Sequence, residues 1–390
     1  MRSRRRPKGA RRPHRAATSN ASDSVAQRKA EHLHLAATRD VQSGTGPGWA
    51  DIRLVHHGLP RADVAAIDLG CDFLGHHLRA PLAIASMTGG HADARTVNTR
   101  LGAAAERFGL AMGVGSQRAA LRRPALVPTY TAARRAAPTA FLIANVGAAQ
   151  LVPQDSGPPL TSRQLADAIA MIGANALAVH LNPLEEIIQP EGDRRVSGIR
   201  EALASTAASI GVPVIAKETG AGLSRGVALE LRELGVRALD VGGAGGTSFA
   251  AIEAARAEAR GDAGRAKLGA VYHEWGVPTA VSIVASRAAG LPIIATGGVR
   301  TGLDAAKALA LGATLVGVGR PLLLAALEGE RALDAWITQF LEELRVAVFL
   351  TGGRGVADLA GVPRVILGST RSWIEDLGYD DAPAPAPTGR

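Results

Sequence analysis

The stretch PIIATGGVRTGLDAAKALALGATLVGVGR, residues 292–320, contains two short apolar runs with a helical pattern between them. The runs at 292–298 and 314–320 are rich in Ile, Val and Ala and include glycines near their ends. Residues 301–313, between the two runs, place Leu and Ala at helical spacing. Two strands joined by one helix form a βα unit whose strands run parallel.

The same unit repeats along the chain. Eight apolar runs alternate with helical patterns, at 81–86, 110–116, 141–148, 176–182, 213–218, 238–244, 292–298 and 314–320. Eight parallel strands with crossover helices, over roughly 250 residues, describe a (β/α)8 TIM barrel, an α/β fold. A doubly wound sheet is the alternative, but SMTGGHADART after the first run lacks the required G-x-G-x-x-G spacing. We therefore predict one barrel domain over residues 28–370.

The composition supports a large α/β core and excludes several classes of protein. Hydrophobic residues make up 47% of the 390 residues and aromatic residues only 3%, so the core rests on Ala, Val, Leu and Ile. The single cysteine, Cys71, excludes an internal disulfide and a cysteine-based metal cage. The sequence has no apolar run long enough to cross a bilayer and no signal-peptide pattern, and we expect a cytoplasmic protein.

The formal net charge of +9 is concentrated at the N-terminus. Residues 1–16 carry eight Lys or Arg and no acid, so the rest of the chain has a net charge of only +1. We predict that the basic residues 1–27 and the Pro/Ala-rich residues 371–390 are disordered tails. Contact of the basic tail with RNA, an anionic membrane or a partner is the alternative, but without interleaved aromatic residues we do not predict a nucleic-acid function.

Polar residues and glycines gather at the C-terminal ends of the predicted strands, where such barrels hold their sites. They are Ser86, Thr88, Ser116, Gln117, Asn145, His180, Asn182, Lys217, Glu218, Gly245 to Ser248, Gly297 to Arg300, and Arg320. Two glycine-rich ends, TGGVRTG at 296–302 and GVGRPL at 317–322, each lead into a helix. Their backbone amides can bind a phosphate, with added charge from Arg300 or Arg320. The alternative is that these glycines only form tight turns.

Lys217 ends the strand at 213–218, so its ammonium should point into the barrel mouth. Three roles remain open for this lysine. It can form a structural ion pair with Glu218, a Schiff base with a carbonyl substrate, or a charge that balances an anionic cofactor such as a reduced flavin.

A cluster of acids follows the strand at 176–182, within VHLNPLEEIIQPEGDR, residues 179–194. The cluster contains His180, Asn182, Glu185, Glu186, Glu191 and Asp193. Anions so close together raise one another's pKa, which indicates a bound cation or a role in proton transfer. A solvated acidic loop is the alternative.

Basic residues also precede the predicted barrel, in RKAEHLHLA, residues 28–36. Arg28, Lys29 and His32 would form an anion clamp if this segment folds back over the barrel mouth. From spacing alone, an ordinary charged helix is the simpler interpretation.

Eleven strings share a fixed order and spacing: RKAEHL, LVHHGLP, ASMTGG, MGVGSQR, IANVGA, VHLN…EE…QPEGDR, AKETGAG, GGAGGTSF, EWGVPTA, ATGGVRTGLDAAKALALGA and VGVGRPLL. Together they closely resemble the type 2 isopentenyl-diphosphate isomerases, from about residue 28 to about residue 365. The resemblance implies an FMN-dependent barrel of isoprenoid biosynthesis that interconverts isopentenyl and dimethylallyl diphosphate. It also implies reduced flavin, with NADPH as the reductant, a divalent metal such as Mg²⁺, and a homo-oligomer.

The resemblance assigns roles to the strand ends. It implies that FMN is bound by Ser86, Met87, Thr88, Ser116, Asn145, Lys217, Thr247, Gly297, Gly298, Val299, Arg300, Gly319 and Arg320. It implies that the diphosphate is bound by Arg28, Lys29, Ser116, Gln117, Arg118, His180 and Asn182, with Glu185 beside them, and that Glu186 holds Mg²⁺. The expected catalytic residues are Lys217, His180 and Glu185, with reduced flavin as acid and base and Lys217 stabilising its anionic form.

One position departs from the family pattern. After His-Leu-Asn the family reads x-x-Gln-Glu, whereas this chain has Pro183, Leu184, Glu185 and Glu186. An amide can donate a hydrogen bond to a diphosphate, and a carboxylate cannot unless it is protonated or bridged through a metal. Glu185 can therefore be a second Mg²⁺ ligand, a neutral acid, or a sign of altered substrate use.

Two other functions compete with the isomerase. A 2-hydroxy-acid oxidase or dehydrogenase on the same fold depends on a His-Gly-Gly/Ala-Arg run after a late strand, and ATGGVRTG has no histidine. An FMN-binding barrel with impaired turnover rests on Glu185 alone. Retention of Arg28, Lys29, His180, Glu186 and Lys217 argues against this second alternative.

Overall fold

The computed structural model describes residues 31–32, 34–35 and 38–379. The predicted tail at 1–27 lies outside these residues, and so do Arg28, Lys29 and residues 380–390. None of the helices in the described part of the chain is both long and apolar enough to cross a lipid bilayer.

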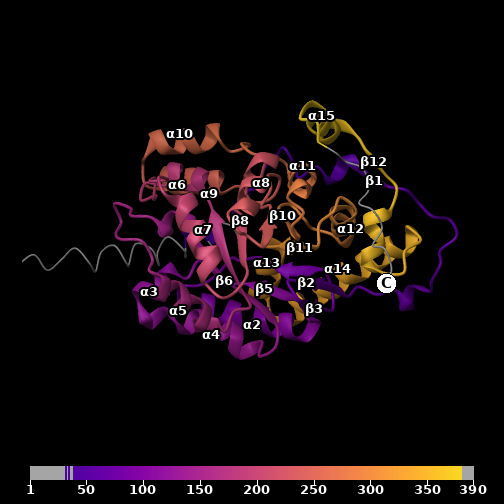
Figure 1. The fold of residues 1–390 in the computed structure, drawn as a ribbon, viewed down its shortest axis with the longest axis horizontal. Coiled ribbons are helices and arrows are strands. Elements are labelled where there is room, and N and C mark those ends of the chain that lie inside the picture. The colour runs from indigo at the N-terminus through magenta and orange to yellow at the C-terminus, as the bar shows by residue number, and fades with distance from the viewer. Residues whose placement is uncertain (1–30, 33, 36–37, 380–390) are drawn as a thin grey trace, which may run out of the picture.

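Eight parallel strands close into a barrel at the centre of the molecule (Figure 1). They are β4 (Leu82–Ile84), β5 (Ala111–Gly113), β6 (Phe141–Gly147), β7 (Ala176–Leu181), β8 (Val214–Glu218), β9 (Ala238–Asp240), β10 (Ile293–Thr296) and β11 (Leu315–Val318). Each strand pairs with the next along the chain, and β11 closes the ring by pairing with β4. The predicted (β/α)8 fold and all eight predicted strands are confirmed.

Helices surround the barrel (Figure 1). They are α2 (Ala94–Phe108), α3 (Arg118–Arg122), α4 (Pro128–Ala136), α5 (Ser162–Ile172), α6 (Pro183–Ile188), α7 (Ile199–Ser209), α8 (Arg225–Glu233), α9 (Phe249–Ala259), α10 (Ala263–Val271), α11 (Thr279–Ser286), α12 (Gly302–Ala310), α13 (Arg320–Glu328), α14 (Glu330–Leu350) and α15 (Gly368–Asp376). Side-chain caps fix the starts of several helices. At α12, the Thr301 hydroxyl accepts from the Asp304 amide, and the Asp304 carboxylate accepts from the Thr301 amide. Short 3₁₀ turns lie at η1 (Trp49–Asp51), η2 (Val64–Ala66), η3 (Pro124–Leu126), η4 (Ala148–Leu151), η5 (Arg287–Ala289) and η6 (Val356–Gly361).

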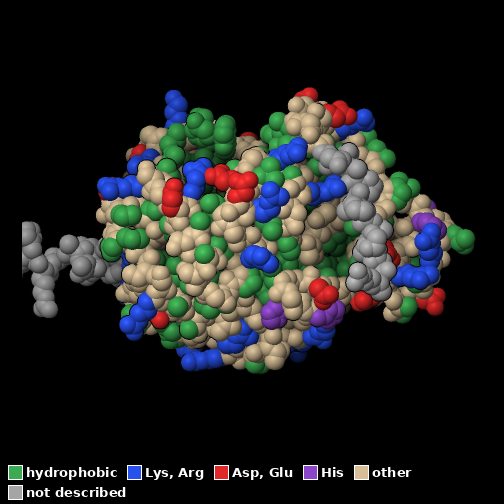
Figure 2. Space-filling model, in the orientation of Figure 1, with side chains coloured by type: hydrophobic (Ala, Val, Ile, Leu, Met, Phe, Trp, Pro, Cys, Tyr) green, Lys and Arg blue, Asp and Glu red, His purple; other side chains and the backbone are tan. Residues whose placement is uncertain are grey.

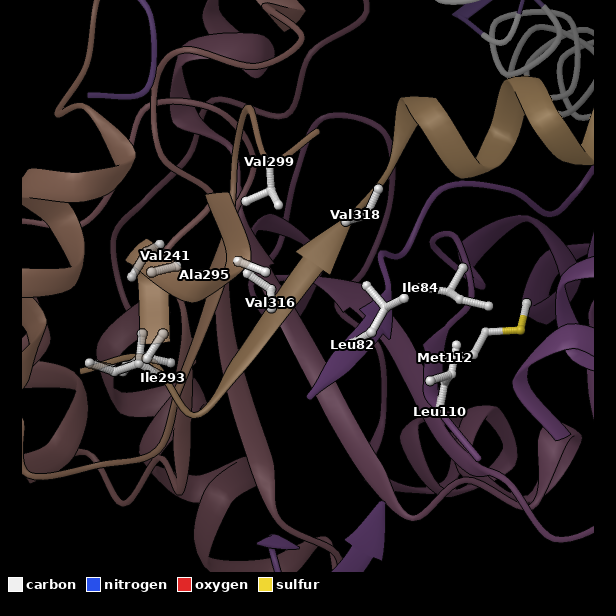
Figure 3. Packing of buried hydrophobic residues seen from close by; sticks show 14 of the residues in the cluster. Leu82, Ile84, Leu110, Met112, Val241, Ile293, Ala295, Val299, Val316 and Val318 are labelled. Atoms are coloured by element: carbon white, nitrogen blue, oxygen red, sulfur yellow. The ribbon is translucent and has the colours of Figure 1, made fainter. Parts of the chain in front are cut away.

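The strands are buried on both faces, which explains their nearly continuous apolar sequences. Alternate residues such as Leu82 and Ile84 join the large core between strands and helices, which Figure 3 shows from close by. The residue between them, Ala83, belongs to a smaller core inside the barrel. Alanine recurs in that inner core on several strands, so the small residues are what let eight short strands close tightly.

A hairpin closes the N-terminal end of the barrel. It consists of β2 (Cys71–Phe73) and β3 (His76–Leu78), which pair antiparallel. Phe73 and Leu78 join the inner core, and the Phe73 ring lies 5.6 Å from that of Phe141, the first residue of β6. With this end filled by side chains, the opposite end of the barrel is where a ligand can enter.

The C-terminal part of the described chain packs beside the barrel. Strand β12 (Arg364–Ile366) pairs antiparallel with β1 (Ile52–Leu54), and α15 follows. The predicted domain boundary at residue 370 therefore falls inside a helix. Thr370 and Ile374 are buried there, and the Thr370 amide donates to Asp51 over 2.9 Å, which explains why the chain stays ordered past that boundary.

The surface carries both signs of charge. On the face in Figure 2, lysine and arginine side chains are scattered among acidic ones instead of gathering in one large patch. This agrees with the near-neutral charge predicted for the chain beyond its first 16 residues.

Candidate functional site

A cavity of about 730 Å³ opens at the C-terminal ends of the barrel strands. Residues at or just after all eight strands line it: Ser86, Ser116, Asn145, His180, Lys217, Gly242, Thr296 and Gly317. This is the end at which (β/α)8 barrels hold their sites, and the volume suits a cofactor together with a small substrate.

Most of the predicted site residues meet in this cavity. Its lining includes Ser86, Met87, Thr88, Ser116, Arg118, Asn145, His180, Asn182, Glu185, Glu186, Lys217, Thr247, Gly297, Gly298, Val299, Arg300, Gly319 and Arg320. His32 also lines it, whereas the predicted clamp residues Arg28 and Lys29 lie outside the described residues.

Gln117 does not fit its predicted contact with the diphosphate. Its side chain is fully buried and is absent from the cavity lining. Nε2 donates to the Ala168 carbonyl over 2.7 Å, and Oε1 accepts from the Asn145 amide over 2.9 Å. Ser116 lines the cavity, whereas the side chain of Gln117, the N-cap residue of α3, turns toward α5 and bonds the Ala168 carbonyl.

Sheet register brings polar side chains together at one level of the barrel. Gly147, His180, Lys217 and Asp240 are successive register partners across β6, β7, β8 and β9. Register partners point to the same side of a sheet, so the three side chains all face the barrel mouth. Gly147 makes room at the end of this row, because a Cβ there would lie 2.8 Å from His180 Nε2.

Strand glycines make room for polar side chains at two further places. Thr296 and Gly317 are register partners on β10 and β11, and a Cβ on Gly317 would overlap the Thr296 hydroxyl. A Cβ on Gly113 of β5 would overlap the Ser86 hydroxyl in the same way. From the sequence, the late glycines were expected to bind a phosphate or to form tight turns, and this role within the strands was not predicted.

The loops after β10 and β11 form a cradle that fits a phosphate. Gly297 and Gly298 have φ values of 125° and 65°, and a side chain on Gly298 would collide with the Gly245 carbonyl. Among the described residues, no side chain caps the N-terminus of the nine-residue helix α13, so its first amides can serve an anion. The buried Thr296 hydroxyl also lacks a hydrogen-bond partner among the described residues. These donors fit a phosphorylated cofactor.

Lys217 is held as a fixed positive charge. Its Nζ lies 3.0 Å from Asp240 Oδ2 and donates to the backbone carbonyl of Glu218 over 3.1 Å. An ion pair between Lys217 and the Glu218 side chain was one of the three roles considered for this lysine. That role is wrong, because Glu218 Oε2 accepts instead from the four amides of residues 219–222. Burial raises the pKa of Glu218 to about 7. An ion-paired ammonium favours a role in charge balance over that of a Schiff-base nucleophile.

Two carboxylates of helix α6, which follows β7, also line the cavity. Glu186 is buried; its Oε1 accepts from Asn182 Nδ2 over 3.1 Å and its Oε2 from the Asp193 amide over 2.6 Å. Asn182 Nδ2 also donates to Glu185 Oε2 over 3.0 Å. Burial, and next the charge of Glu185, raise the pKa of Glu186 to about 7. The effect on Glu186 is in the direction expected for neighbouring acids, and its carboxylate fits a divalent cation.

The other two acids of this segment serve the structure around the cavity. Asp193 Oδ2 pairs with Arg118 Nη1 over 2.5 Å, and its Oδ1 accepts from the Ser156 hydroxyl. Glu191 pairs with Arg256 over 2.8 Å. Arg118 thereby keeps its guanidinium at the cavity wall, and its buried Nε has no hydrogen-bond partner among the described residues.

The tautomer of His180 follows from its neighbour. Asn145 Nδ2 donates to the Val114 carbonyl over 3.0 Å, which turns Asn145 Oδ1 toward His180 Nδ1 at 2.8 Å. An amide oxygen only accepts, so Nδ1 carries a proton. A neutral ring then presents Nε2 as an acceptor, and donation from Nε2 to a diphosphate requires the imidazolium.

Residues 41–43 form a wall of the cavity that was not predicted from the sequence. The Ser43 amide donates to the Gly246 carbonyl over 2.9 Å, and the Ser248 amide donates to the Val41 carbonyl over 2.8 Å. Gln42 thereby reaches the cavity lining and contacts the Arg300 guanidinium. Glu274 accepts from Ser43, Gly44 and Thr45; although burial acts to raise its pKa, these hydrogen bonds lower it to about 2. Pairing of two segments through a few isolated backbone hydrogen bonds leaves no periodic pattern in a sequence.

Comparison with solved structures supports the fold. A mandelate oxidase structure with an FMN adduct matches with a TM-score of 0.58 and 17% identity, covering 90% of this chain and 100% of that chain. A lactate oxidase of Pediococcus acidilactici matches with a TM-score of 0.61 and 14% identity, covering 90% and 94%. At these identities the likeness concerns the fold alone.

Comparison with sequences is more specific. Residues 200–363 match the family described as FMN-dependent dehydrogenase. The isopentenyl-diphosphate delta-isomerase of Methanoregula boonei is 48% identical over 90% of this chain and 97% of its own length. That of Archaeoglobus fulgidus is 44% identical over 91% and 100%, respectively. Identity at this level along nearly the whole of both chains is decisive, and the chain belongs to the isopentenyl-diphosphate delta-isomerase family.

Proposed function

We propose that this protein interconverts isopentenyl diphosphate and dimethylallyl diphosphate by adding a proton at one carbon and removing one at another. The observation that carries the proposal is the composition of one cavity. A phosphate cradle at the ends of β10 and β11, the fixed charge of Lys217, and the group formed by Arg118, His180 and two carboxylates all line this cavity. One cavity thus offers both a cofactor site and a metal–diphosphate site.

FMN fits the cofactor side. The proposed contacts are the loops at 297–300 and 319–320, together with Ser86, Thr88, Asn145, Thr247 and Lys217. When bound in reduced form, FMN supplies the acid and the base for this proton exchange. Lys217 contributes a positive charge that stabilises negative charge on the cofactor, and Asp240 holds the ammonium in place.

The substrate side recognises an anionic head group. Arg118 and His180 donate to the diphosphate, the latter as an imidazolium, while Ser116 and Asn182 add polar contacts. Glu186 would hold Mg²⁺, which would supply positive charge to offset that of the diphosphate. Arg28 and Lys29 complete the clamp in this proposal, although they lie outside the described residues.

Apolar side chains exclude water from the reacting carbons. The cavity lining includes Phe249, Ile252, Leu323, Leu324 and Trp336. A reactive carbocation-like species between these side chains is protected from capture by water, which a polar wall would promote. The protein therefore orients the substrate, stabilises charge and keeps water away from the reacting carbons.

Further parts of the proposal concern the context of the reaction. NADPH is the proposed reductant of the flavin, Mg²⁺ the proposed metal, and the cytoplasm the proposed location. A homo-oligomer is the proposed assembly. The family membership supports these expectations, and each of them can be tested with the purified protein.

The competing oxidase function has weaker support. The oxidases with a similar fold share only 14% to 18% identity with this chain. The chain lacks the His-Gly-Gly/Ala-Arg run on which such enzymes depend, because ATGGVRTG after β10 has no histidine. An FMN-binding barrel with impaired turnover rests only on Glu185.

The proposed function is tested in two steps with the full chain. Purified protein should take up FMN, seen as protein-bound flavin absorbance. It should then convert isopentenyl diphosphate to dimethylallyl diphosphate anaerobically with NADPH and Mg²⁺. If the protein takes up FMN but does not convert isopentenyl diphosphate, it is an FMN-binding barrel with impaired turnover. Oxidation of a 2-hydroxy acid would instead favour the oxidase.

A further inference from the structure

We infer that His32, Glu185 and Glu253 form a second divalent-metal site at the cavity mouth, distinct from Glu186 and suited to a transition metal. One ligand atom from each of the three side chains lies within 4.8 Å of the other two. Ligand atoms that share one metal at bond lengths of about 2.1 Å lie at most about 4.2 Å apart, so the three atoms must close in slightly. His32 Nε2 and Glu253 Oε1, which are 2.6 Å apart, must also separate for a metal to replace the hydrogen bond between them.

Glu253 is the most constrained of the three ligands. It lies on α9 and is fully buried. Its Oε2 accepts from Arg256 Nη1 over 2.6 Å, and its Oε1 lies 2.6 Å from His32 Nε2. Arg256 also pairs with Glu31 and Glu191, which fixes the guanidinium. One oxygen of Glu253 is therefore anchored and the other is directed at the cluster.

The other two ligands approach from separate elements. The His32 side chain is only 17% exposed and its ring packs 6.1 Å from that of Phe249. Glu185 extends from α6, and both Glu185 and His32 line the cavity. The site thus joins residues near the start of the described chain to two helices that follow different barrel strands.

The donor set indicates the class of metal. One imidazole nitrogen with two carboxylate oxygens suits Zn²⁺, Mn²⁺ or Fe²⁺, whereas Mg²⁺ prefers oxygen ligands alone and keeps its waters. Two carboxylates that converge on one imidazole also require a positive charge between them. A metal ion or a protonated His32 can provide that charge, and a metal-binding measurement separates the two.

The inference goes beyond the proposed isomerase reaction and does not depend on it. A metal at this position would tie His32, close in sequence to the proposed clamp residues Arg28 and Lys29, to helices α6 and α9. It would sit beside the proposed Mg²⁺ ligand Glu186 without sharing a side chain with it.

The test measures Zn²⁺ binding to the chelator-treated, FMN-loaded full chain by calorimetry, with Mn²⁺ and electron paramagnetic resonance as a second probe. His32→Gln and Glu185→Gln should each weaken binding by at least about tenfold. His34→Gln removes an exposed histidine of the same segment and should leave the affinity within about twofold.

Several outcomes would overturn the inference. Equal Zn²⁺ affinity in the wild type, His32→Gln and Glu185→Gln would leave His32 as an imidazolium between two carboxylates. Loss of binding in Glu186→Gln, with binding kept in Glu185→Gln, would leave only the proposed Mg²⁺ site. Melting temperature and flavin absorbance check the fold of each variant, and Glu185, which is half-exposed, carries the test if His32→Gln misfolds. Isomerase activity is assayed separately with Mg²⁺ alone, so failure of one proposal is distinguishable from failure of the other.

Discussion

Asp240 Oδ2 lies 3.0 Å from Lys217 Nζ, and the two residues are also register partners on β9 and β8. Both side chains are buried, that of Asp240 with 8% and that of Lys217 with 9% of its surface exposed. A buried charge that loses its partner costs about 3–5 kcal/mol, so this pair is held together strongly. The ion pair turns a flexible lysine into a fixed charge in the cavity that the phosphate cradle also lines.

Lys217→Ala should lower turnover much more than it raises the KM for isopentenyl diphosphate. The ammonium is proposed to act on the cofactor, so its loss removes stabilisation in the transition state and leaves substrate binding nearly intact. We expect kcat to fall by about 10²-fold or more, the loss typical of one preorganised electrostatic group. Steady-state kinetics with saturating FMN measure both constants. Equal losses in affinity and turnover would place Lys217 on the substrate.

The Mg²⁺ requirement should fall as the pH rises from 6 to 8. The pKa of Glu186 is raised from 4.5 to about 7 in the folded protein, so Glu186 is largely neutral below pH 7 and must lose its proton to bind the metal. The apparent affinity for Mg²⁺ should therefore rise by about tenfold per pH unit below pH 7 and level off above pH 7. Without metal, the same raised pKa stabilises the fold below about pH 4.5, and this contribution is lost as the pH rises through 7.

Calorimetric titration of Mg²⁺ at several pH values measures this slope directly. Glu186→Gln is the matched control, because it keeps the shape of the side chain and removes the titration. If the Mg²⁺ affinity of Glu186→Gln still depends on pH in the same way, the titrating group is not Glu186.

Glu185→Gln and Glu186→Gln should act in opposite directions. If Glu185 faces magnesium diphosphate as a carboxylate, its charge repels the substrate at low metal, and removing that charge should lower the Mg²⁺ concentration for half-maximal activity. Glu186→Gln should instead abolish metal-dependent turnover. Activity measured over a range of Mg²⁺ concentrations tests both variants. Loss of all activity in Glu185→Gln would make that carboxylate an essential group.

Gly317→Ala should destabilise the protein by about 1–3 kcal/mol and weaken FMN binding, because its Cβ would overlap the Thr296 hydroxyl. Thr296→Ala removes that hydroxyl and should recover part of the stability in the double variant. Denaturant unfolding of the wild type, both single variants and the double variant measures the coupling. Additive effects of the two substitutions would show that Gly317 is not needed to accommodate Thr296.

The barrel could be predicted from sequence because each of its strands is locally marked. A short apolar run such as 292–298 ends in glycine or a polar residue, and the helix that follows has its own periodicity and cap. The same logic located the cavity, since parallel strands bring their C-terminal ends to one side. The logic failed at Gln117 because a place in the loop after a strand does not say where a side chain points: Gln117 caps α3 and its side chain turns toward α5.

The contacts that hold the site in place could not be predicted in this way. Asp240 pairs with Lys217 only because of the register between β8 and β9. Arg118 meets Asp193 across 75 residues of sequence, and the wall at 41–43 depends on a single bridge to Thr247. Such contacts depend on how distant segments pack in three dimensions, and no local pattern encodes them.

The central claim is tested most directly by proton NMR of the anaerobic reaction in D₂O, with the full chain, FMN, NADPH, Mg²⁺ and isopentenyl diphosphate. A proton added at one carbon and removed at another predicts many turnovers per flavin, dimethylallyl diphosphate with deuterium in a methyl group, and no net consumption of NADPH beyond the initial reduction. Unchanged isopentenyl diphosphate in the presence of bound, reduced FMN would contradict the account, and so would consumption of NADPH in step with product.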